Sequence, residues 1–430
     1  MTQKIVLATI GSLGDLHPFI AVGLALKARG LSPVLAVPET NVAKVQAAGL
    51  DAVAIFPTFE DIGRLLNMSE EIATARMMRD PDFLFRHVFV RLLPDSVTAL
   101  NRAAEGAAAI VATPFALAAP IVAEMRGLPL IPAMLQPMTM MSASDPPRSP
   151  DFAMLAHGGG RRSLSWNRMM LAVVKMELHR RYGGVVNRVR RSHGLAPLRT
   201  APVFDPPKTA PLTLGLYSSV MGDIQPDYPP NTLLTGFPVF DSDSGAPEAL
   251  DAELAAFLAN GPPPVVFTLG SFAVYAPGDF YRESLAIARL LGHRAVLLTG
   301  AVHAPFDPAP DLIQRAYAPH SLVFPHASVI VHHGGIGTTG QALRAGRPQL
   351  VVPHLGDQWD NGARIVHLNA GAMISAKRYT VGHAAPLIAR LLADQHKADA
   401  AQTLASQVNA EKAADTAADA IARVVINRAA

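Results

Sequence analysis

Residues 329–361 read VIVHHGGIGTTGQALRAGRPQLVVPHLGDQWDN. The apolar start predicts a buried strand, the glycines that follow predict a tight turn, and Thr338–Ala345 predicts the opening of a helix. A strand, a glycine turn and a helix N-terminus together form an anion site, because backbone N–H groups and the positive end of the helix dipole face one point. The stretch therefore predicts an α/β unit that holds a phosphorylated ligand.

The same glycines allow two other interpretations. Gly335–Gly340 has the Gly-x-Gly-x-x-Gly spacing of a dinucleotide-binding turn, and Asp357 lies near the expected distance downstream, as in an NAD(P)-dependent oxidoreductase. The preceding pair His332-His333 and the position of the motif in the second half of the chain count against this alternative. The second interpretation is that the glycines only serve a tight turn between strand and helix. The two histidines and two threonines around the turn count against it.

Outward from this stretch, apolar runs alternate with segments of helical period, the pattern of repeated βα units with a parallel sheet. One expected helix runs from Pro18 to Arg29 with Gly30 as its stop, and Thr58–Val97 is mostly helical. The expected strands are Ile5–Ile10, Ser32–Val37, Ala109–Ala112, Leu128–Ala133, Val265–Leu269, Ala295–Thr299, Leu312–Ala316, Val329–His332 and Gln349–Val352.

Clustered prolines mark an interdomain linker at residues 222–232. We therefore expect an N-terminal Rossmann-like domain at 1–221, a second one at 233–409, and a C-terminal helix at 410–430 that packs back on the N-terminal domain. The length of 430 residues suits two domains rather than one.

Composition excludes several functional classes. The net charge of +3 is small for 430 residues and no dense basic run occurs, which argues against nucleic acid as a partner. The chain has no cysteine, so disulfides, thiolate metal sites and cysteine nucleophiles are excluded. The N-terminus lacks a signal-peptide pattern, and the uncharged stretch Gly106–Ala123 is interrupted by two prolines, so we expect a cytoplasmic protein without a transmembrane segment.

Four stretches resemble the family 1 glycosyltransferases, which have the GT-B fold. They are residues 329–361, Gly11–Pro18 (GSLGDLHP), Phe267–Ser271 (FTLGS) and Tyr317–His320 (YAPH), in matching order and spacing. The resemblance spans nearly the whole chain and looks closest to bacterial rhamnosyltransferases of rhamnolipid synthesis and to macrolide and sterol glycosyltransferases. It implies an α/β protein in which two Rossmann-like βαβ domains face each other across a cleft, the first binding the acceptor and the second the nucleotide sugar.

The resemblance assigns donor-binding residues position by position. His333 matches the histidine that contacts the diphosphate, Tyr317 the aromatic residue under the base, and Asp357-Gln358 the pair that binds the sugar hydroxyls. The other positions expected to contact the donor are Gly14, Ser271, His320, Gly335, Gly337, Thr338 and Thr339. The resemblance implies no permanently bound cofactor and no metal: the co-substrate is a UDP- or dTDP-sugar of the UDP-glucose or dTDP-rhamnose type.

It also implies an inverting displacement, which needs a base near the acceptor oxygen and positive potential at the departing phosphates. Asp15 is the expected base, because it follows the first strand at the carboxyl edge of the sheet and matches an aspartate in some bacterial antibiotic glycosyltransferases. A helix N-cap is the alternative role of Asp15, and His17 is the second candidate base. Thr113 stands where plant enzymes have an orienting Asp, so Asp15 acts alone or with His17.

Three stretches are candidates for the acceptor side. Phe83–Arg91 is apolar with a basic edge, which favours a helix that packs against the pocket, with a weak membrane-surface contact as the alternative. Ser142–Gly160, rich in proline and glycine, predicts a mobile loop. The third is a set of methionines that suits a tolerant apolar pocket or an ordinary core: Met134, Met138, Met140 and Met141.

The sequence thus predicts transfer of a hexose or deoxyhexose from a UDP- or dTDP-sugar to a hydroxyl of a hydrophobic small molecule, such as a lipid, phenolic, sterol or macrolide. The alternatives are the NAD(P)-dependent oxidoreductase and a nucleotide-sugar epimerase on the same fold.

Overall fold

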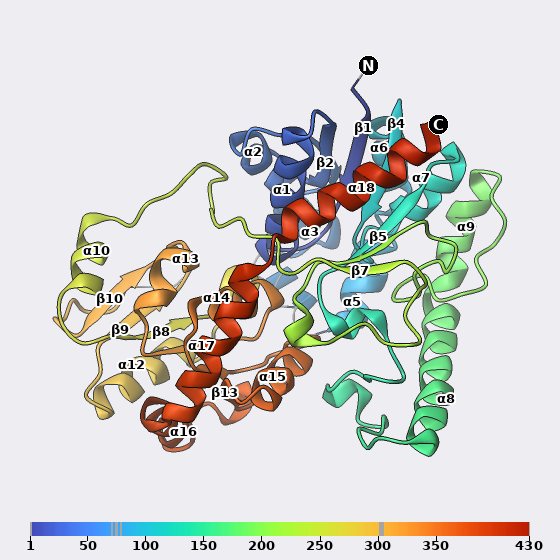
Figure 1. Ribbon diagram of the computed structural model, residues 1–430. Helices are drawn as coiled ribbons and strands as arrows, with labels where there is room; N and C mark the ends of the chain where they lie inside the picture. Colours follow the sequence, from blue (N-terminus) through green and yellow to red (C-terminus); the bar gives the residue numbers. More distant parts are fainter. Residues whose placement is uncertain (1, 70–71, 74–75, 78–79, 301–304, 430) are drawn as a thin grey trace. The chain divides into compact units, whose positions relative to one another are not determined.

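The computed structural model describes residues 2–69, 72–73, 76–77, 80–300 and 305–429 (Figure 1). Its contacts divide the chain into two compact units. Unit 1 comprises Met1–Gly11, Asp15–Phe240 and Lys412–Ala430, and unit 2 comprises Ser12–Gly14 and Asp241–Glu411.

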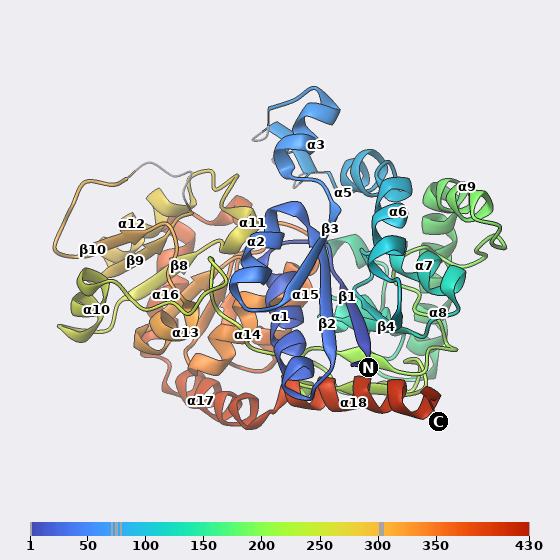
Figure 2. The same cartoon turned by 90° about the horizontal axis from the view of Figure 1, so that it is seen from above.

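Unit 1 contains a seven-stranded parallel sheet in the order β3-β2-β1-β4-β5-β6-β7. Its strands are β1 (Lys4–Ala8), β2 (Ser32–Pro38), β3 (Asp51–Phe56), β4 (Ala107–Ala112), β5 (Leu130–Met134), β6 (Thr213–Gly215) and β7 (Thr232–Leu234). Its helices include α1 (Leu13–Ala28), α2 (Glu39–Ala47), α3 (Phe59–Leu66), α5 (Pro81–Leu84), α6 (Leu93–Ala103), α7 (Ala118–Arg126), α8 (Arg161–Leu178), α9 (Gly184–Ser192) and α18 (Ala413–Ala429). Figure 2 shows α18 in red at the end of the chain, and its Asp415 and Asp419 pair with Arg29 just after α1.

The period-two alternation of the strands explains how this sheet is covered on both faces. Val6 and Ala8 of β1 belong to the core cluster that includes residues of α6 and α7. On α1, Gly23 allows a close approach to the sheet, because a Cβ there would lie 3.1 Å from Leu35 Cδ1 and 2.9 Å from Leu50 Cδ1. The alternate apolar side chains of one strand are therefore buried under different helices.

Unit 2 contains a six-stranded parallel sheet in the order β10-β9-β8-β11-β12-β13. Its strands are β8 (Val265–Thr268), β9 (Ala295–Leu298), β10 (Leu312–Arg315), β11 (Val329–His332), β12 (Gln349–Val351) and β13 (Gly371–Met373). Its helices are α10 (Ala252–Ala259), α11 (Gly270–Ala273), α12 (Phe280–Leu290), α13 (His320–Val323), α14 (Ile336–Ala345), α15 (Gln358–His367), α16 (Val381–Ala393) and α17 (Gln395–Ala410), among the residues described. Val266, Val296 and Ile330 from three neighbouring strands form its core with Ala342 of α14.

Among the described residues, the structure has all nine expected strands, most with ends one or two residues away from those expected, and four further strands. β6, β7 and β13 have only three residues each, too few for a periodic pattern, and β3 begins with the charged Asp51. The largest difference is α1, which begins at Leu13 instead of Pro18. Pro18 is the sixth residue of α1 and has no N–H to donate to the carbonyl of Gly14, so one intrahelical hydrogen bond is missing there.

The contact boundary between the units lies between Phe240 and Asp241, whereas the expected linker is 222–232. β7 follows the clustered prolines and still pairs with β6, so the chain completes the first sheet before it enters unit 2. No described helix is both long enough and apolar enough to cross a bilayer.

Candidate functional site

In both units some of the candidate residues follow the two strands that flank the point where the strand order reverses. In unit 2 this point lies between β8 and β11, and in unit 1 between β1 and β4. Ligands of open parallel sheets bind at the carboxyl ends of such strands, because the connecting helices leave there toward opposite faces. Gly270 and His333 follow β8 and β11, and Asp15 and Thr113 follow β1 and β4.

His333 is buried at the end of β11, and its Nδ1 is a buried atom without a hydrogen-bond partner among the described residues. Burial lowers the pKa of His333 well below its usual value, and His332, His354 and His320 lower it further. The ring is therefore a neutral imidazole, which still offers one N–H donor. A buried polar atom without a partner costs stability, which is acceptable where a ligand supplies the missing bond.

Two glycines make room for the His333 ring. A Cβ at Gly270 would lie 2.5 Å from His333 Cε1, and one at Gly335 would lie 2.3 Å from His333 Nε2. Both distances are shorter than real contacts allow, so a side chain at either position would displace the imidazole. Gly270, from the stretch 267–271, and Gly335, from the stretch 329–361, thus fix the His333 ring between the end of β8 and the start of α14.

Helix α14 begins directly after this ring, with Gly335 at its N-cap. The first hydrogen bond of the helix runs from the Thr339 N–H to the Gly335 carbonyl at 2.9 Å. The N–H groups of Ile336, Gly337 and Thr338 precede that bond and carry the positive end of the helix dipole. The N-terminus of α14 therefore lies beside a buried histidine with an unsatisfied nitrogen, which is the geometry expected of an anion site.

The hydroxyl of Thr339 differs from its expected role as a phosphate contact. Thr339 is fully buried, and its Oγ1 donates to the Gly335 carbonyl at 2.9 Å, so its proton stabilises the turn. Thr338 is also buried, with 7% of its surface exposed.

His332 has a structural role next to His333. Its Nδ1 accepts the Gly334 N–H at 3.1 Å, so Nε2 carries the proton and donates to Gln349 Oε1 at 2.9 Å. Burial lowers the pKa of His332 to about 4, which keeps this neutral tautomer in place. Among the described residues, no group of three or more His, Asp or Glu side chains could hold a metal ion.

Asp357 and Gln358 lie at the start of α15, and both contribute to the turn around them. Asn361 Nδ2 donates to Asp357 Oδ2 and to the Gly334 carbonyl, both at 2.9 Å. Gln358 Oε1 accepts the N–H groups of His354 at 2.8 Å and Leu355 at 3.2 Å, which leaves its amide nitrogen as the donor that remains. The expected sugar-binding pair is thus held against the glycine turn.

Three residues of this network were not expected from the sequence. Gly334 has φ +92°, and a Cβ there would lie 2.7 Å from Val351 Cγ1, so this glycine rather than its neighbours is required by the backbone. Asn361 is fully buried and joins the turn to α15, and His354 Nε2 is a buried atom without a described partner. The role of Asn361 could have been predicted from its four-residue spacing from Asp357, because residues four apart on a helix are neighbours.

Tyr317 and His320 follow β10 at the same edge of the sheet. The Tyr317 hydroxyl donates to Asp241 Oδ1 at 3.1 Å, and the other carboxylate oxygen of Asp241 accepts the Ser321 N–H at 2.6 Å. His320 stacks on Phe324 at 4.4 Å between ring centroids. Ser271 lies in the short helix α11 after β8.

Asp15 lies in the first turn of α1. It is the third helical residue, so the N-cap interpretation is wrong, although a carboxylate in this turn still interacts favourably with the helix dipole. A Cβ at Gly11 would lie 2.2 Å from Asp15 Oδ2, so the absence of a side chain at Gly11 gives the carboxylate its position. Gly14 lies in the same turn, before Asp15.

The Thr9 hydroxyl contacts Asp15, since it donates to the Asp15 carbonyl oxygen at 3.4 Å. His17 meets Phe240 edge to face, with the ring centroids 5.5 Å apart. After β4, the Thr113 N–H donates to the Ala8 carbonyl at 3.1 Å, and its hydroxyl donates to Thr9 Oγ1 at 3.4 Å. Thr113 therefore joins β4 to β1 by hydrogen bonds to backbone and hydroxyl.

Most of the candidate acceptor-side residues are packed inside unit 1. Phe83, Phe85 and Val88 are buried, which favours the packing interpretation of Phe83–Arg91 over a membrane contact. Met134, Met140 and Met141 are likewise buried. The loop 142–160 is held by hydrogen bonds from Ser142 Oγ and Ala143 N–H to Asp227 and by bonds of Asn167 to Ala143 and Ala156.

Comparison with known proteins shows which proteins this chain is similar to. Residues 298–427 match the model of the erythromycin biosynthesis protein CIII-like C-terminal domain. The chain is 29% identical to O-mycaminosyltylonolide 6-deoxyallosyltransferase of Streptomyces fradiae over 96% of both chains. It is 28% identical to vancomycin aglycone glucosyltransferase of Amycolatopsis orientalis, over 86% of this chain and 85% of that protein.

A solved structure agrees at the level of the fold. The spinosyn rhamnosyltransferase SpnG, complexed with thymidine diphosphate, superimposes with a TM-score of 0.68 at 18% identity, covering 97% of this chain and 100% of that one. The expectation of an α/β protein with two parallel-sheet domains of the GT-B type is confirmed. The full-length relatives favour the predicted glycosyltransferase over an oxidoreductase. This chain is a glycosyltransferase of the GT-B fold, and over most of its length it is similar to sugar transferases such as vancomycin aglycone glucosyltransferase.

Proposed function

We propose that the chain is an inverting hexosyl- or deoxyhexosyltransferase that uses a dTDP- or UDP-sugar and glycosylates a hydroxyl of a hydrophobic small molecule. The observation that carries the donor half is the buried, neutral His333, whose Nδ1 has no described partner, beside the N-terminus of α14. A diphosphate is the ligand chemistry that fits, because it accepts hydrogen bonds from both and is stabilised by the helix dipole.

In the proposed reaction the acceptor oxygen forms a bond to the anomeric carbon as the bond from that carbon to the diphosphate oxygen breaks. The acceptor proton passes to the Asp15 carboxylate, with His17 as the second candidate base. The developing charge on the leaving diphosphate is stabilised by the α14 N–H groups, the His333 imidazole and the backbone around Gly335 and Gly337. Asp357 and the amide nitrogen of Gln358 bind the sugar hydroxyls.

The remaining expected contacts complete the proposed donor site. Tyr317 and His320 contact the nucleotide base of the donor. Ser271, Thr338 and Gly14 lie beside its phosphates. A thymidine diphosphate in the related SpnG structure supports a dTDP-sugar, and the glucosyltransferase among the relatives supports UDP-glucose as the second donor. The names of the relatives support a small-molecule acceptor, since one is named for a vancomycin aglycone and another for O-mycaminosyltylonolide.

The experiment begins with calorimetric titration of the protein with dTDP, UDP and NADH. The proposal expects one diphosphate to bind and NADH not to bind. Binding of NADH alone would end the proposal and restore the oxidoreductase alternative.

A second step incubates the protein with dTDP-rhamnose, dTDP-glucose and UDP-glucose and with lipid, phenolic, sterol and macrolide hydroxyls, followed by mass spectrometry. The expected product is the acceptor mass plus one sugar, with the anomeric configuration inverted by NMR. Conversion of the donor to an epimeric sugar without any acceptor would identify the epimerase alternative instead.

A further inference from the structure

Helix α8 of unit 1 carries an exposed apolar stripe. Trp166, Met169, Val173 and Met176 lie three or four residues apart and share one face of the helix. Their side chains are between 45% and 65% exposed. Met154 is exposed as well, and it lies beside the stripe because Trp166 Nε1 donates to its carbonyl at 2.8 Å. We call these five residues the α8 stripe.

The opposite face of α8 is packed against unit 1, so the helix already contributes a face to the core and the stripe is a second, exposed apolar face. Leu171 is buried in a cluster with Met141, Ala143 and Leu155. Asn167 is also buried, and its side chain bonds to the backbone of Ala143 and Ala156 at 2.8–3.0 Å. The helix therefore has one fixed orientation, in which four large apolar side chains face solvent.

Basic residues are concentrated in the segment of the chain that carries the stripe. Residues 161–199, which contain α8 and α9, hold ten Lys and Arg and one Glu, whereas the whole chain has a net charge of only +3. The rest of the chain is therefore net negative, and the basic character is confined to this segment. Arg162 and Arg180 extend the helical spacing of the stripe at its two ends, and Arg161 and Arg168 are exposed beside it.

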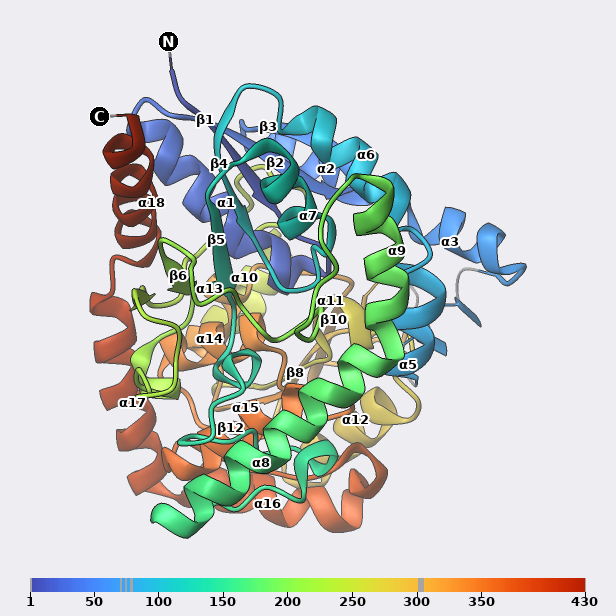
Figure 3. The same cartoon turned by 90° about the vertical axis from the view of Figure 1, so that its right-hand side faces the viewer.

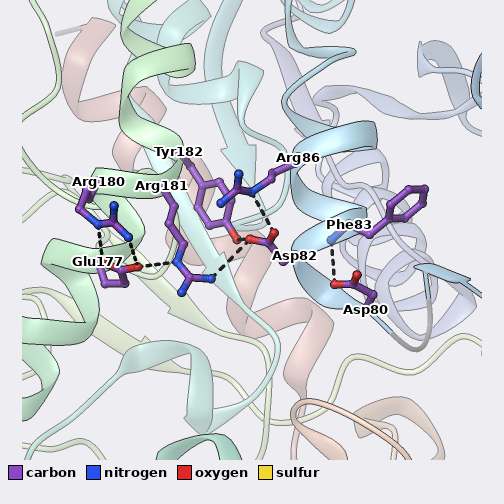
Figure 4. A network of polar contacts seen from close by, with 8 residues as sticks. All are labelled: Asp80, Asp82, Phe83, Arg86, Glu177, Arg180, Arg181 and Tyr182. Carbon is purple, nitrogen blue, oxygen red and sulfur yellow. Dashed lines mark hydrogen bonds and ion pairs between the residues drawn. The ribbon is translucent and has the colours of Figure 1, made fainter.

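Figure 3 shows α8 and α9 in green as two parts of one bent helix. The bend contains His179–Gly183, where polar contacts tie the helix to the segment around α5 (Figure 4). The Tyr182 hydroxyl donates to Asp82 Oδ1 at 2.6 Å, and Arg181 lies 3.5 Å from the same oxygen. Glu177, the acid of this segment, pairs with Arg180 and Arg181. The arginines of the bend therefore fix the direction of α8, while those near its start remain exposed to solvent.

We propose that α8 binds an anionic lipid surface, with the α8 stripe in the headgroup–acyl boundary and the surrounding arginines on the lipid phosphates. A helix that lies in a membrane interface combines exposed Trp and aliphatic side chains with Lys or Arg. Charge complementarity favours this occupant, because each basic residue near an anionic bilayer adds to the attraction. The binding is independent of sugar transfer, and it brings the enzyme to the phase in which apolar molecules dissolve.

The test is co-sedimentation of the full-length protein with vesicles of 70% phosphatidylcholine and 30% phosphatidylglycerol, compared with pure phosphatidylcholine. Binding to the anionic vesicles is expected, and it should fall at least tenfold between 50 mM and 500 mM salt because exposed charges are screened. The stripe variant Met169→Gln/Val173→Thr/Met176→Gln and the charge variant Arg161→Gln/Arg162→Gln/Arg168→Gln should each bind at least tenfold more weakly.

Matched controls remove the same side-chain types elsewhere. Leu290→Gln/Ile426→Gln replaces exposed apolar residues of α12 and α18, and Lys377→Gln/Arg378→Gln replaces exposed cations, and both should bind like the wild type. Circular dichroism and the dTDP affinity establish that each variant is folded.

Three results would overturn the proposal. They are no binding to the anionic vesicles, equal vesicle binding by the wild type, the stripe variant and the charge variant, or a loss of vesicle binding in the control variants as large as in the other two. If the protein instead forms a concentration-dependent dimer in analytical ultracentrifugation that the stripe variant abolishes, a second copy covers α8. None of these outcomes bears on dTDP binding or glycosyl transfer, which are measured without vesicles.

Discussion

His333 is the residue on which the donor half of the proposed function depends. Its ring is buried and neutral, and its Nδ1 lacks a described partner. We expect His333→Ala to weaken dTDP or UDP binding at least tenfold, because one hydrogen bond to a charged group contributes about 1.5–3 kcal/mol. Calorimetry measures the change, with His193→Ala on the exposed surface of unit 1 as the control. An unchanged Kd would remove His333 from the diphosphate site.

Asp15 is the residue on which the acceptor half of the proposed function depends. Asp15→Asn keeps the shape beside Gly11 and removes the base, so kcat should fall by about 10²–10⁴-fold while dTDP affinity stays within about twofold. The control Asp51→Asn changes an exposed carboxylate at the start of β3. Steady-state kinetics and calorimetry together separate the two effects. Wild-type turnover in the variant would transfer the role of base to His17 or another group.

At the scale of one element, the turn before α14 contains two adjacent glycines with different physical roles. Gly334 has φ +92°, and a Cβ there would lie 2.9 Å from the Gln358 carbonyl oxygen. Gly335 has an ordinary φ of −59°, and the atoms nearest to a Cβ there would be those of the His333 ring. The first glycine therefore serves the fold, and the second serves the position of the histidine.

The pair Gly334→Ala and Gly335→Ala tests this division. Gly334→Ala should destabilise unit 2 by about 1–3 kcal/mol, because it combines backbone strain with a clash against backbone. Gly335→Ala should cost less stability but weaken dTDP binding as strongly as His333→Ala, because it displaces the imidazole. Denaturant unfolding and calorimetry measure the two quantities. Equal losses of stability in both variants would contradict the assignment.

For the whole molecule, buried neutral histidines make stability depend on pH. The folded pKa of His332 is lowered to about 4 by burial, below the usual 6.5 of the unfolded chain. Between these values the unfolded state binds more protons, so the free energy of unfolding is highest above pH 6.5 and falls as the pH drops toward 4. The loss from His332 alone is on the order of 3 kcal/mol, and His333 shifts in the same direction.

Urea unfolding at pH 7.5, 5.5 and 4.5 measures this loss, with the transition of unit 2 followed separately because two units need not unfold together. A His332→Gln variant should show a smaller slope over this range, and His193→Gln should keep the wild-type slope. A flat stability profile from pH 7.5 to 4.5 would mean that both histidines titrate normally in the folded protein.

The sequence determined the repeated βα units, because β-branched runs such as Val329–Val331 are buried on both faces of a parallel sheet and stop at glycine turns. The strand, glycine turn and helix start before α14 were predictable for the same reason, since they are contiguous in the chain. The three-residue strands β6, β7 and β13 were not predictable, because pairing with a neighbouring strand, rather than local pattern, forms them.

Only the tertiary structure decided which polar atoms of the motifs have partners within the protein and which do not. Thr339 and His332 share the motif with His333, yet their polar atoms are satisfied by Gly335, Gly334 and Gln349. Burial and partners arise from segments distant in sequence, such as Gly270 against His333, and one-dimensional spacing does not contain them. The sequence determined the chemistry of this edge of the sheet, and packing decided which nitrogen was left without a partner.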